Sequence, residues 1–138
     1  KGDMIVYILS YIEPLGQYSV TDVGCSTKER CDFPIYANKL CQNITETENQ
    51  NENAMGILIC GSANGVAMTA NKYANVRAGL CWSKEIVSLI RQHNNANVIC
   101  IPARFVDLKL AKEMAKVFLE TDFEGGRHQR RVGKIACQ

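Results

Sequence analysis

A single cysteine stands where an apolar run meets a loop of small residues. Residues 56–65 read GILICGSANG, so Cys60 ends the run and Gly61–Gly65 follow it. A thiol held at the end of a strand can serve as a nucleophile or a base. The backbone N–H groups of a loop that opens a helix can bind an oxyanion such as a phosphate or an enediolate. The alternative is a small buried cysteine before a tight turn, and the spacing leaves both interpretations open.

Two common phosphate-binding motifs are absent from this loop. It has neither the Lys-Ser/Thr pair of a Walker loop nor the G-x-G-x-x-G of a dinucleotide site. Any oxyanion there must therefore be bound by main-chain groups and short side chains.

A histidine and two arginines are the other candidates for chemistry. His93 and Asn94 lie at a predicted helix end, where a histidine can act in acid–base catalysis or simply cap the helix. Arg127 and Arg131 are four residues apart, which places both on one face of a helix. A phosphate between two guanidinium groups would relieve their repulsion, and a solvated basic face is the alternative. The same charges favour nucleic acid less, because no aromatic residues alternate with them.

Composition limits the class of protein. The chain has 138 residues, 46% of them hydrophobic, and a net charge of +2, which fits a single domain over 1–138 and gives no support for nucleic-acid binding. No apolar run approaches the ~20 residues of a membrane span, and no secretory signal is expected. Seven cysteines without a Cys-x-x-Cys pair favour a reducing, cytoplasmic location over a disulfide framework or a zinc site.

Hydrophobic periodicity predicts alternating strands and helices. We expect helices over 5–15, 34–44 and 65–73, further helices capped by Ser83 and Asp107, and a basic helical segment within 123–138. We expect strands over 18–24, 56–61, 76–82 and 97–103, and an exposed, mobile connection over 45–53.

This alternation is typical of an α/β fold. It predicts a Rossmann-like three-layer α/β/α domain with a mostly parallel sheet of about five strands. Ligands of such folds gather at the carboxyl ends of the strands, where Cys60 is expected. Because the chain opens on a helix, we expect that the N-terminal strand of this fold is missing from it, before Lys1.

Several segments together resemble the type B ribose-5-phosphate isomerases, a family that includes isomerases of galactose 6-phosphate and allose 6-phosphate. The segments are GILICGSANGVAMTANKYANVRAGLC, SLIRQHNNANVICIPAR, FEGGRHQRRV and DVGCSTKERCDFPIYA, and the resemblance runs from about Asp22 to Val132. It implies an isomerase that interconverts ribose 5-phosphate and ribulose 5-phosphate without a cofactor or metal. It also implies a homodimer whose active sites are shared between subunits.

The resemblance assigns roles residue by residue. Cys60 matches the base that removes the proton from carbon 2, and His93 matches the residue that opens the sugar ring. Ser62 adds a donor for the enediolate. The matched substrate-binding residues are Gly61, Ser62, Ala63, Asn64, Gly65, Asn94, Arg104, Arg127 and Arg131.

The chain departs from the family pattern in three ways. An Asp-His pair that follows the family's first strand has no counterpart, Phe33 replaces a tyrosine, and Ala63 replaces a glycine. If position 63 needs a positive φ, alanine there costs about 1 kcal/mol. Two alternatives stay open at this point: an isomerase of a six-carbon sugar phosphate, and a non-catalytic phosphosugar-binding module.

Overall fold

The core of the fold is a small parallel sheet. In the computed structural model, which describes residues 2–27 and 29–136, three strands pair in the order β1-β3-β2. Both pairings are parallel, with Gly56 opposite Val98 and Cys60 opposite Pro102. In chain order the elements are α1 (Gly2–Ile12), η1 (Glu13–Leu15), α2 (Phe33–Asn49), β1 (Gly56–Cys60), α3 (Asn64–Ala70), β2 (Ala78–Leu80), α4 (Lys84–Asn94), β3 (Val98–Pro102), α5 (Leu108–Glu120) and α6 (Arg127–Val132).

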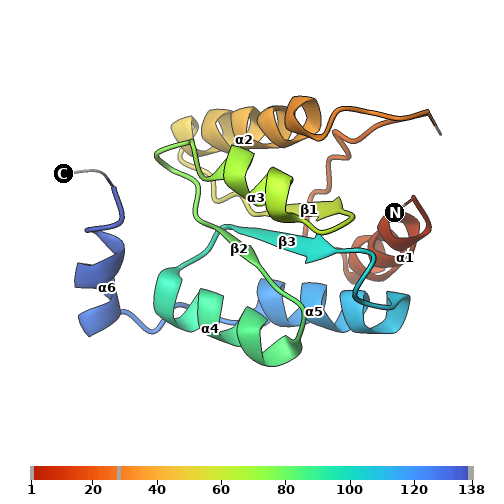
Figure 1. Ribbon diagram of the computed structural model, residues 1–138. Coiled ribbons are helices and arrows are strands. Elements are labelled where there is room, and N and C mark those ends of the chain that lie inside the picture. Colours follow the sequence, from red (N-terminus) through yellow and green to blue (C-terminus); the bar gives the residue numbers. More distant parts are fainter. Residues whose placement is uncertain (1, 28, 137–138) are drawn as a thin grey trace.

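Helices cover both faces of the sheet, which confirms the predicted α/β layering. On one face, α2 and α3 pack against Leu58, Val98 and Cys100. On the other face, α1, α4 and α5 pack against Ile59, Ile99 and Ile101, whose side chains point away from α2 and α3. Figure 1 shows α2 and α3 above the sheet and α4 and α5 below it, with α6 beyond one end. Successive side chains of β1 thus point to opposite faces of the sheet. Because helices cover both faces, every position of the strand is apolar.

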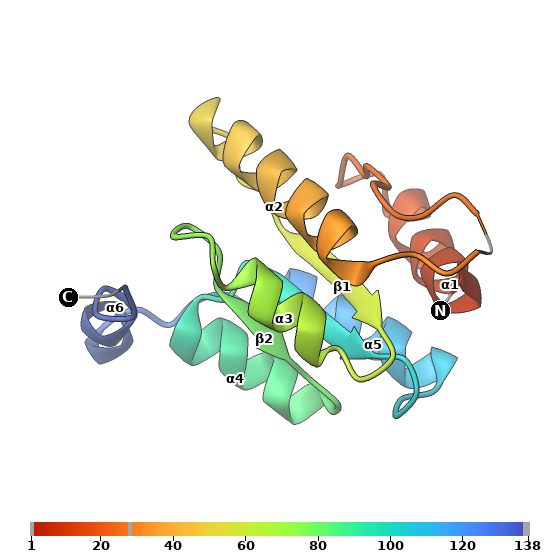
Figure 2. The same cartoon turned by 45° about the horizontal axis from the view of Figure 1, so that its top comes forward.

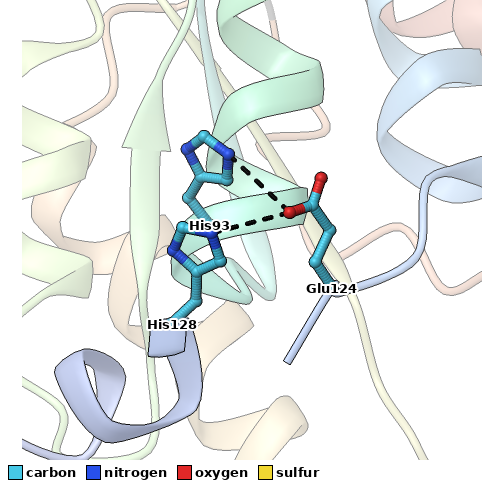
Figure 3. Close-up of side chains that lie close together, drawn as sticks. All are labelled: His93, Glu124 and His128. Carbon is cyan, nitrogen blue, oxygen red and sulfur yellow. Dashed lines mark ion pairs between the residues drawn. The ribbon is translucent and has the colours of Figure 1, made fainter. Parts of the chain in front are cut away.

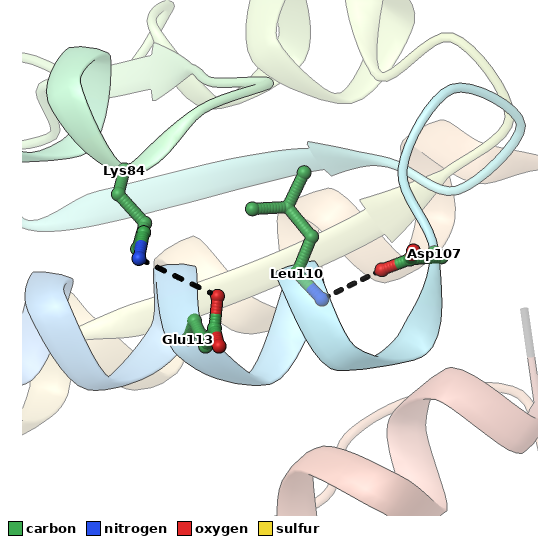
Figure 4. Close-up of polar contacts among 4 residues, drawn as sticks. All are labelled: Lys84, Asp107, Leu110 and Glu113. Atoms are coloured by element: carbon green, nitrogen blue, oxygen red, sulfur yellow. Dashed lines mark hydrogen bonds and ion pairs between the residues drawn. The ribbon is translucent and has the colours of Figure 1, made fainter.

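Local signals located the starts of two helices correctly. The Ser83 side chain accepts a hydrogen bond from the Ile86 N–H at the start of α4. The Asp107 carboxylate accepts one from the Leu110 N–H, at 2.7 Å, at the start of α5 (Figure 4). Such caps satisfy backbone donors that have no partner within the helix.

Two predicted elements differ from the structure. Residues 18–24 form no strand, and since no neighbouring strand pairs with them most of their side chains stay exposed. The described residues therefore contain three strands rather than about five. Residues 45–49 are helical rather than a mobile connection, because α2 continues to Asn49. Contacts distant in sequence support this extension: the Asn75 amide donates to Thr45 at 3.1 Å and to Glu48 at 2.9 Å.

The six cysteines within residues 2–27 and 29–136 fall into three groups. Cys25 and Cys31 form a disulfide, so the expectation of a chain without disulfides is wrong for this pair. Burial raises the pKa of the Cys41 thiol to about 11 and those of Cys81 and Cys100 to about 12, which keeps these thiols protonated. Cys60 is free and partly exposed.

Some sequence expectations concern residues beyond this description. Lys1, the Ile5 side chain and residues 137–138 of the basic segment lie outside the described residues. Among the described helices, none has the length and apolar character needed to cross a bilayer.

Candidate functional site

The first group of candidate residues lies at the carboxyl end of the sheet, which we call the cysteine end (residues 60–65 and Arg104). Cys60 is the last residue of β1, and its side chain packs on the α2–α3 side of the sheet. Backbone pairing continues past both strands, since Ala103 N–H donates to Cys60 O and Arg104 N–H donates to Gly61 O. This extension brings Arg104, from a separate segment, alongside the loop that follows Cys60.

A left-handed residue turns the chain from β1 into α3. Ala63 has φ +62° and ψ +1° and is fully buried at the N-cap of α3. Position 63 therefore does need the positive φ, and alanine bears the strain that glycine would not. The turn makes the loop compact and places its backbone N–H groups just before the start of α3. We call this loop, residues 61–65, the cradle.

Short side chains complete the cradle. The Ser62 hydroxyl oxygen lies 3.4 Å from the Asn64 N–H and 3.3 Å from its side-chain amide, both of which donate to it. The hydroxyl hydrogen of Ser62 thus stays available as a donor. The Phe33 ring covers Gly65 so closely that a Cβ there would lie 2.5 Å from the ring. Phe33 accordingly fixes the loop by contact, a role that needs no tyrosine hydroxyl.

Arg104 gives this end its positive charge. Its side chain lies against Gly61, where a Cβ would lie 3.1 Å from Nε. Beside it is a hollow lined by Ser62, Asn64, Leu80, Trp82, Pro102 and Phe105. Of the predicted site residues, Ser62 and Asn64 line this hollow, whereas Cys60 lies at the end of β1 and packs toward α2 and α3.

The second group lies at the opposite end of the sheet, which we call the histidine end (His93, Asn94 and α6). His93 and Asn94 form the last turn of α4, which stops at Asn95 in the left-handed region. The Arg91 guanidinium donates to Ala96 O at 2.6 Å and to Thr121 O at 3.0 Å, so it ties the end of α4 to the end of α5. These bonds hold the helix end that carries His93.

Two residues at the histidine end were not singled out from the sequence. The His128 ring stacks on His93 with centroids 4.2 Å apart and planes 11° apart. Glu124 Oε2 lies 3.5 Å from His128 Nε2 and 4.0 Å from His93 Nε2 (Figure 3). The only sequence signal was the spacing of Glu124 and His128, four residues apart, and Gly125 and Gly126 between them obscured it. Burial of the ring, then the charges of His93 and Arg127, lower the pKa of His128.

Arg127 and Arg131 also belong to the histidine end. Both are exposed on α6, which packs against α4 through the His93–His128 stack. The structure thus places the predicted phosphate ligands Arg127 and Arg131 on a helix that packs beside His93.

One chain does not bring the two groups together. Because the strands are parallel and α4 runs back along the sheet, its last turn lies near the start of β3, whereas Cys60 lies opposite the end of β3. The length of β1 separates these ends, roughly 13 Å for five residues. Figures 1 and 2 both show α6 at the end of the sheet remote from the strand arrowheads. Cys60, Ser62 and Arg104 thus form one partial site, and His93, Arg127 and Arg131 form another.

Comparison with known proteins agrees with the resemblance found in the sequence. Residues 3–135 match the family model described as Ribose/Galactose Isomerase. Ribose-5-phosphate isomerase B of Escherichia coli K12 is 40% identical over 118 residues, which cover 86% of this chain and 76% of that protein.

Solved structures are similar in fold as well as in sequence. The crystal structure of ribose-5-phosphate isomerase B from Mycoplasma genitalium with bound ribulose 5-phosphate has a TM-score of 0.88 and 37% identity, covering 96% of this chain and 86% of that one. The ribose-5-phosphate isomerase B structure from Anaplasma phagocytophilum has a TM-score of 0.87 and 35% identity, covering 97% and 88%.

Proposed function

This chain belongs to the ribose/galactose isomerase family, and on that premise we propose that it interconverts D-ribose 5-phosphate and D-ribulose 5-phosphate through an enediolate. The observation that carries the proposal is the partly exposed Cys60 thiol beside the left-handed turn at Ala63. A base and a set of amide donors thereby share one surface, as proton abstraction next to a carbonyl requires. The relative that holds ribulose 5-phosphate supports a five-carbon substrate.

In the proposed mechanism His93 acts first, by donating a proton to the ring oxygen of the cyclic aldose. The bond between carbon 1 and this oxygen breaks, the anomeric hydroxyl loses its proton, and the open-chain aldehyde results. The Cys60 thiolate then removes the proton from carbon 2, and the electron pair moves toward the carbonyl oxygen to give an enediolate. The N–H groups of residues 61–65 and the Ser62 hydroxyl donate hydrogen bonds to the charged oxygen. The proton then returns to carbon 1 while the hydroxyl proton on carbon 2 moves to the oxygen on carbon 1, which gives the ketose with no net loss of protons or electrons.

The remaining residues bind the substrate. Arg127 and Arg131 bind the phosphate, whose paired oxygens match the geometry of guanidinium groups. Asn94 contacts the sugar hydroxyls near His93, and Arg104 contacts the substrate at the cysteine end.

The protein works as a homodimer with shared active sites. The separation of Cys60 from His93 supports this part of the proposal, because a second copy related by twofold symmetry can supply the missing end to each site. Exposed aromatic residues beside the cysteine-end hollow also support it: Trp82 is 55% exposed and Phe105 is 73% exposed. A second copy covering them would remove an apolar surface from water.

Residues 1–138 act as one sugar-phosphate isomerase domain, and we place it in the cytoplasm. The metabolic activity named for its relatives supports this location.

Replacement of the base tests the proposed function. Cys60→Ala is expected to lower turnover of ribose 5-phosphate at least ~100-fold, the usual size of a general-base contribution. Cys41→Ala, which removes a buried thiol from α2, is the matched control and is expected to keep turnover near the parent value. Equal turnover by parent and Cys60→Ala would remove Cys60 from the mechanism. Turnover of allose 6-phosphate and galactose 6-phosphate, compared with that of ribose 5-phosphate, shows whether the enzyme prefers a five-carbon or a six-carbon sugar phosphate.

A further inference from the structure

Three potential metal ligands meet at the histidine end, on three separate segments. His93 belongs to α4, Glu124 to the connection between α5 and α6, and His128 to α6. One ligand atom from each residue lies within 4.8 Å of the other two. The Glu124 N–H donates to Gln92 O at 3.1 Å, which holds its backbone beside His93. Figure 3 shows both imidazole rings turned toward the same carboxylate oxygen.

The donor set suits a zinc-class cation. Two imidazole nitrogens and one carboxylate oxygen are common Zn²⁺ ligands, and open zinc sites use three protein ligands. Bonds of about 2.0–2.2 Å in a tetrahedron place neighbouring ligand atoms roughly 3.4 Å apart. The two nitrogen–oxygen separations here are 3.5 and 4.0 Å, and all three ligand atoms lie within 4.8 Å of one another, so the side chains must rotate toward one point to bind a single ion. The rings must also open from their parallel stack, because each nitrogen binds a metal in the plane of its own ring.

We propose that His93, Glu124 and His128 bind one divalent ion of the zinc class, and that this ion inhibits the isomerase. The inhibition rests on the proposed function, in which His93 opens the sugar ring. A metal bound to Nε2 of His93 prevents the ring from becoming an imidazolium, which is the form that donates a proton to the sugar. Release of the ion restores the free imidazole, so the inhibition is reversible by a chelator.

The charges around the three ligands determine how strongly this site binds a cation. Glu124 carries the only negative charge of the ligand set, whereas Arg127 and Arg131 nearby oppose a cation. Binding therefore depends strongly on the Glu124 charge.

Ribulose 5-phosphate is open-chain, since its carbon-5 oxygen is esterified and cannot close on carbon 2. The metal is thus expected to inhibit conversion of the cyclic aldose more than conversion of the ketose.

Binding is tested first with Co²⁺, whose visible absorption reports its coordination. The titration uses metal-free protein carrying Cys60→Ala, because that change removes the exposed thiol from the possible ligands. We expect one Co²⁺ per chain, and at least about tenfold weaker binding when Glu124→Gln is added. Glu120→Gln removes the same charge from an exposed position at the end of α5 and is the matched control. Equal affinity of the Glu124→Gln and Glu120→Gln proteins would overturn the site.

Inhibition is tested next with Zn²⁺ in the chain that retains Cys60. We expect the Zn²⁺ concentration for half-inhibition of ribose 5-phosphate turnover to rise at least about tenfold in Glu124→Gln and to stay unchanged in Glu120→Gln. Each variant is compared with its own rate in excess chelator. Metal binding that depends on Glu124 but leaves turnover unchanged would overturn the inhibition, and the role assigned to His93 with it. The Co²⁺ titration needs no turnover, so failure of the isomerase assignment is distinguishable from failure of the metal site.

Discussion

The cysteine end and the histidine end differ in the groups that they offer to a charged ligand. At the cysteine end, backbone N–H groups form the cradle, and the strained turn at Ala63 and the ring of Phe33 hold it in place. At the histidine end, the candidate binding groups are side chains of α4 and α6, and Arg127 and Arg131 among them are exposed. Fixed dipoles suit a charge that exists only during the reaction, because they need no rearrangement at that moment. Long cationic side chains suit the phosphate, which is charged throughout.

This difference separates the expected kinetic effects. Changes at the cysteine end should lower the rate of the chemical step, since they act on transition-state charge. Changes to the arginines should weaken binding in the ground state and transition state alike, which raises KM.

Complementation between the two ends is the largest expected effect. Cys60→Ala and the double variant Arg127→Ala/Arg131→Ala should each be nearly inactive, whereas co-refolding equal amounts should restore about a quarter of parent activity. Half of the randomly formed dimers would be mixed, and each would contain one intact shared site. Turnover of ribose 5-phosphate measures the recovery. A mixture no more active than its parts would contradict the sharing of sites between subunits.

Loss of one phosphate ligand should have the next largest effect. Arg131→Ala is expected to raise KM for ribose 5-phosphate roughly 10- to 100-fold, which corresponds to one hydrogen bond to a charged group. The effect on unphosphorylated ribose should be small. Arg130→Ala, on the same exposed helix, is the control for general loss of charge. Matching effects on the two sugars would show that Arg131 does not bind the phosphate.

Acidification should destabilise the histidine end in particular. The folded-state pKa of His128 lies below its ordinary value of 6.5. Between these two pKa values the unfolded chain binds a proton at His128 and the folded chain does not. The contribution of His128 to stability is therefore fully present above pH 6.5 and is lost as pH falls toward the lower folded pKa. Tm should fall from about pH 7.5 to about pH 5.5, and less steeply in His128→Gln. Parallel curves for the two proteins would rule out this role of His128.

The smallest expected effect concerns the strained turn. In Ala63→Gly, relief of about 1 kcal/mol of left-handed strain offsets about 0.8 kcal/mol for the buried methyl group, so the free energy of unfolding should change little. Ala67→Gly, in the right-handed part of α3, should lose about 1 kcal/mol because glycine weakens a helix interior. Urea unfolding of both variants gives the comparison. Equal losses would mean that strain at position 63 is negligible.

Sequence alone predicted the features that depend on local chemistry. The strands over 56–61 and 97–103 were found from apolar runs bounded by loops, and the starts of α4 and α5 from Ser83 and Asp107, because capping acts within one turn. The conditional prediction for Ala63 was also correct, since a strand-to-helix turn constrains its own backbone.

Tertiary structure decided the features that depend on distant partners. Residues 18–24 have β-branched side chains but form no strand, because a strand needs a neighbour that their own sequence does not supply. Residues 45–49 look like a polar connection but are helical, where Asn75 bonds to Thr45 and Glu48. The meeting of Glu124 with two histidines, and the distance between His93 and Cys60, follow from how the helices pack on the sheet. Residue types therefore indicated the candidate groups, whereas the parallel direction of the strands placed Cys60 and His93 at opposite ends of the chain's fold.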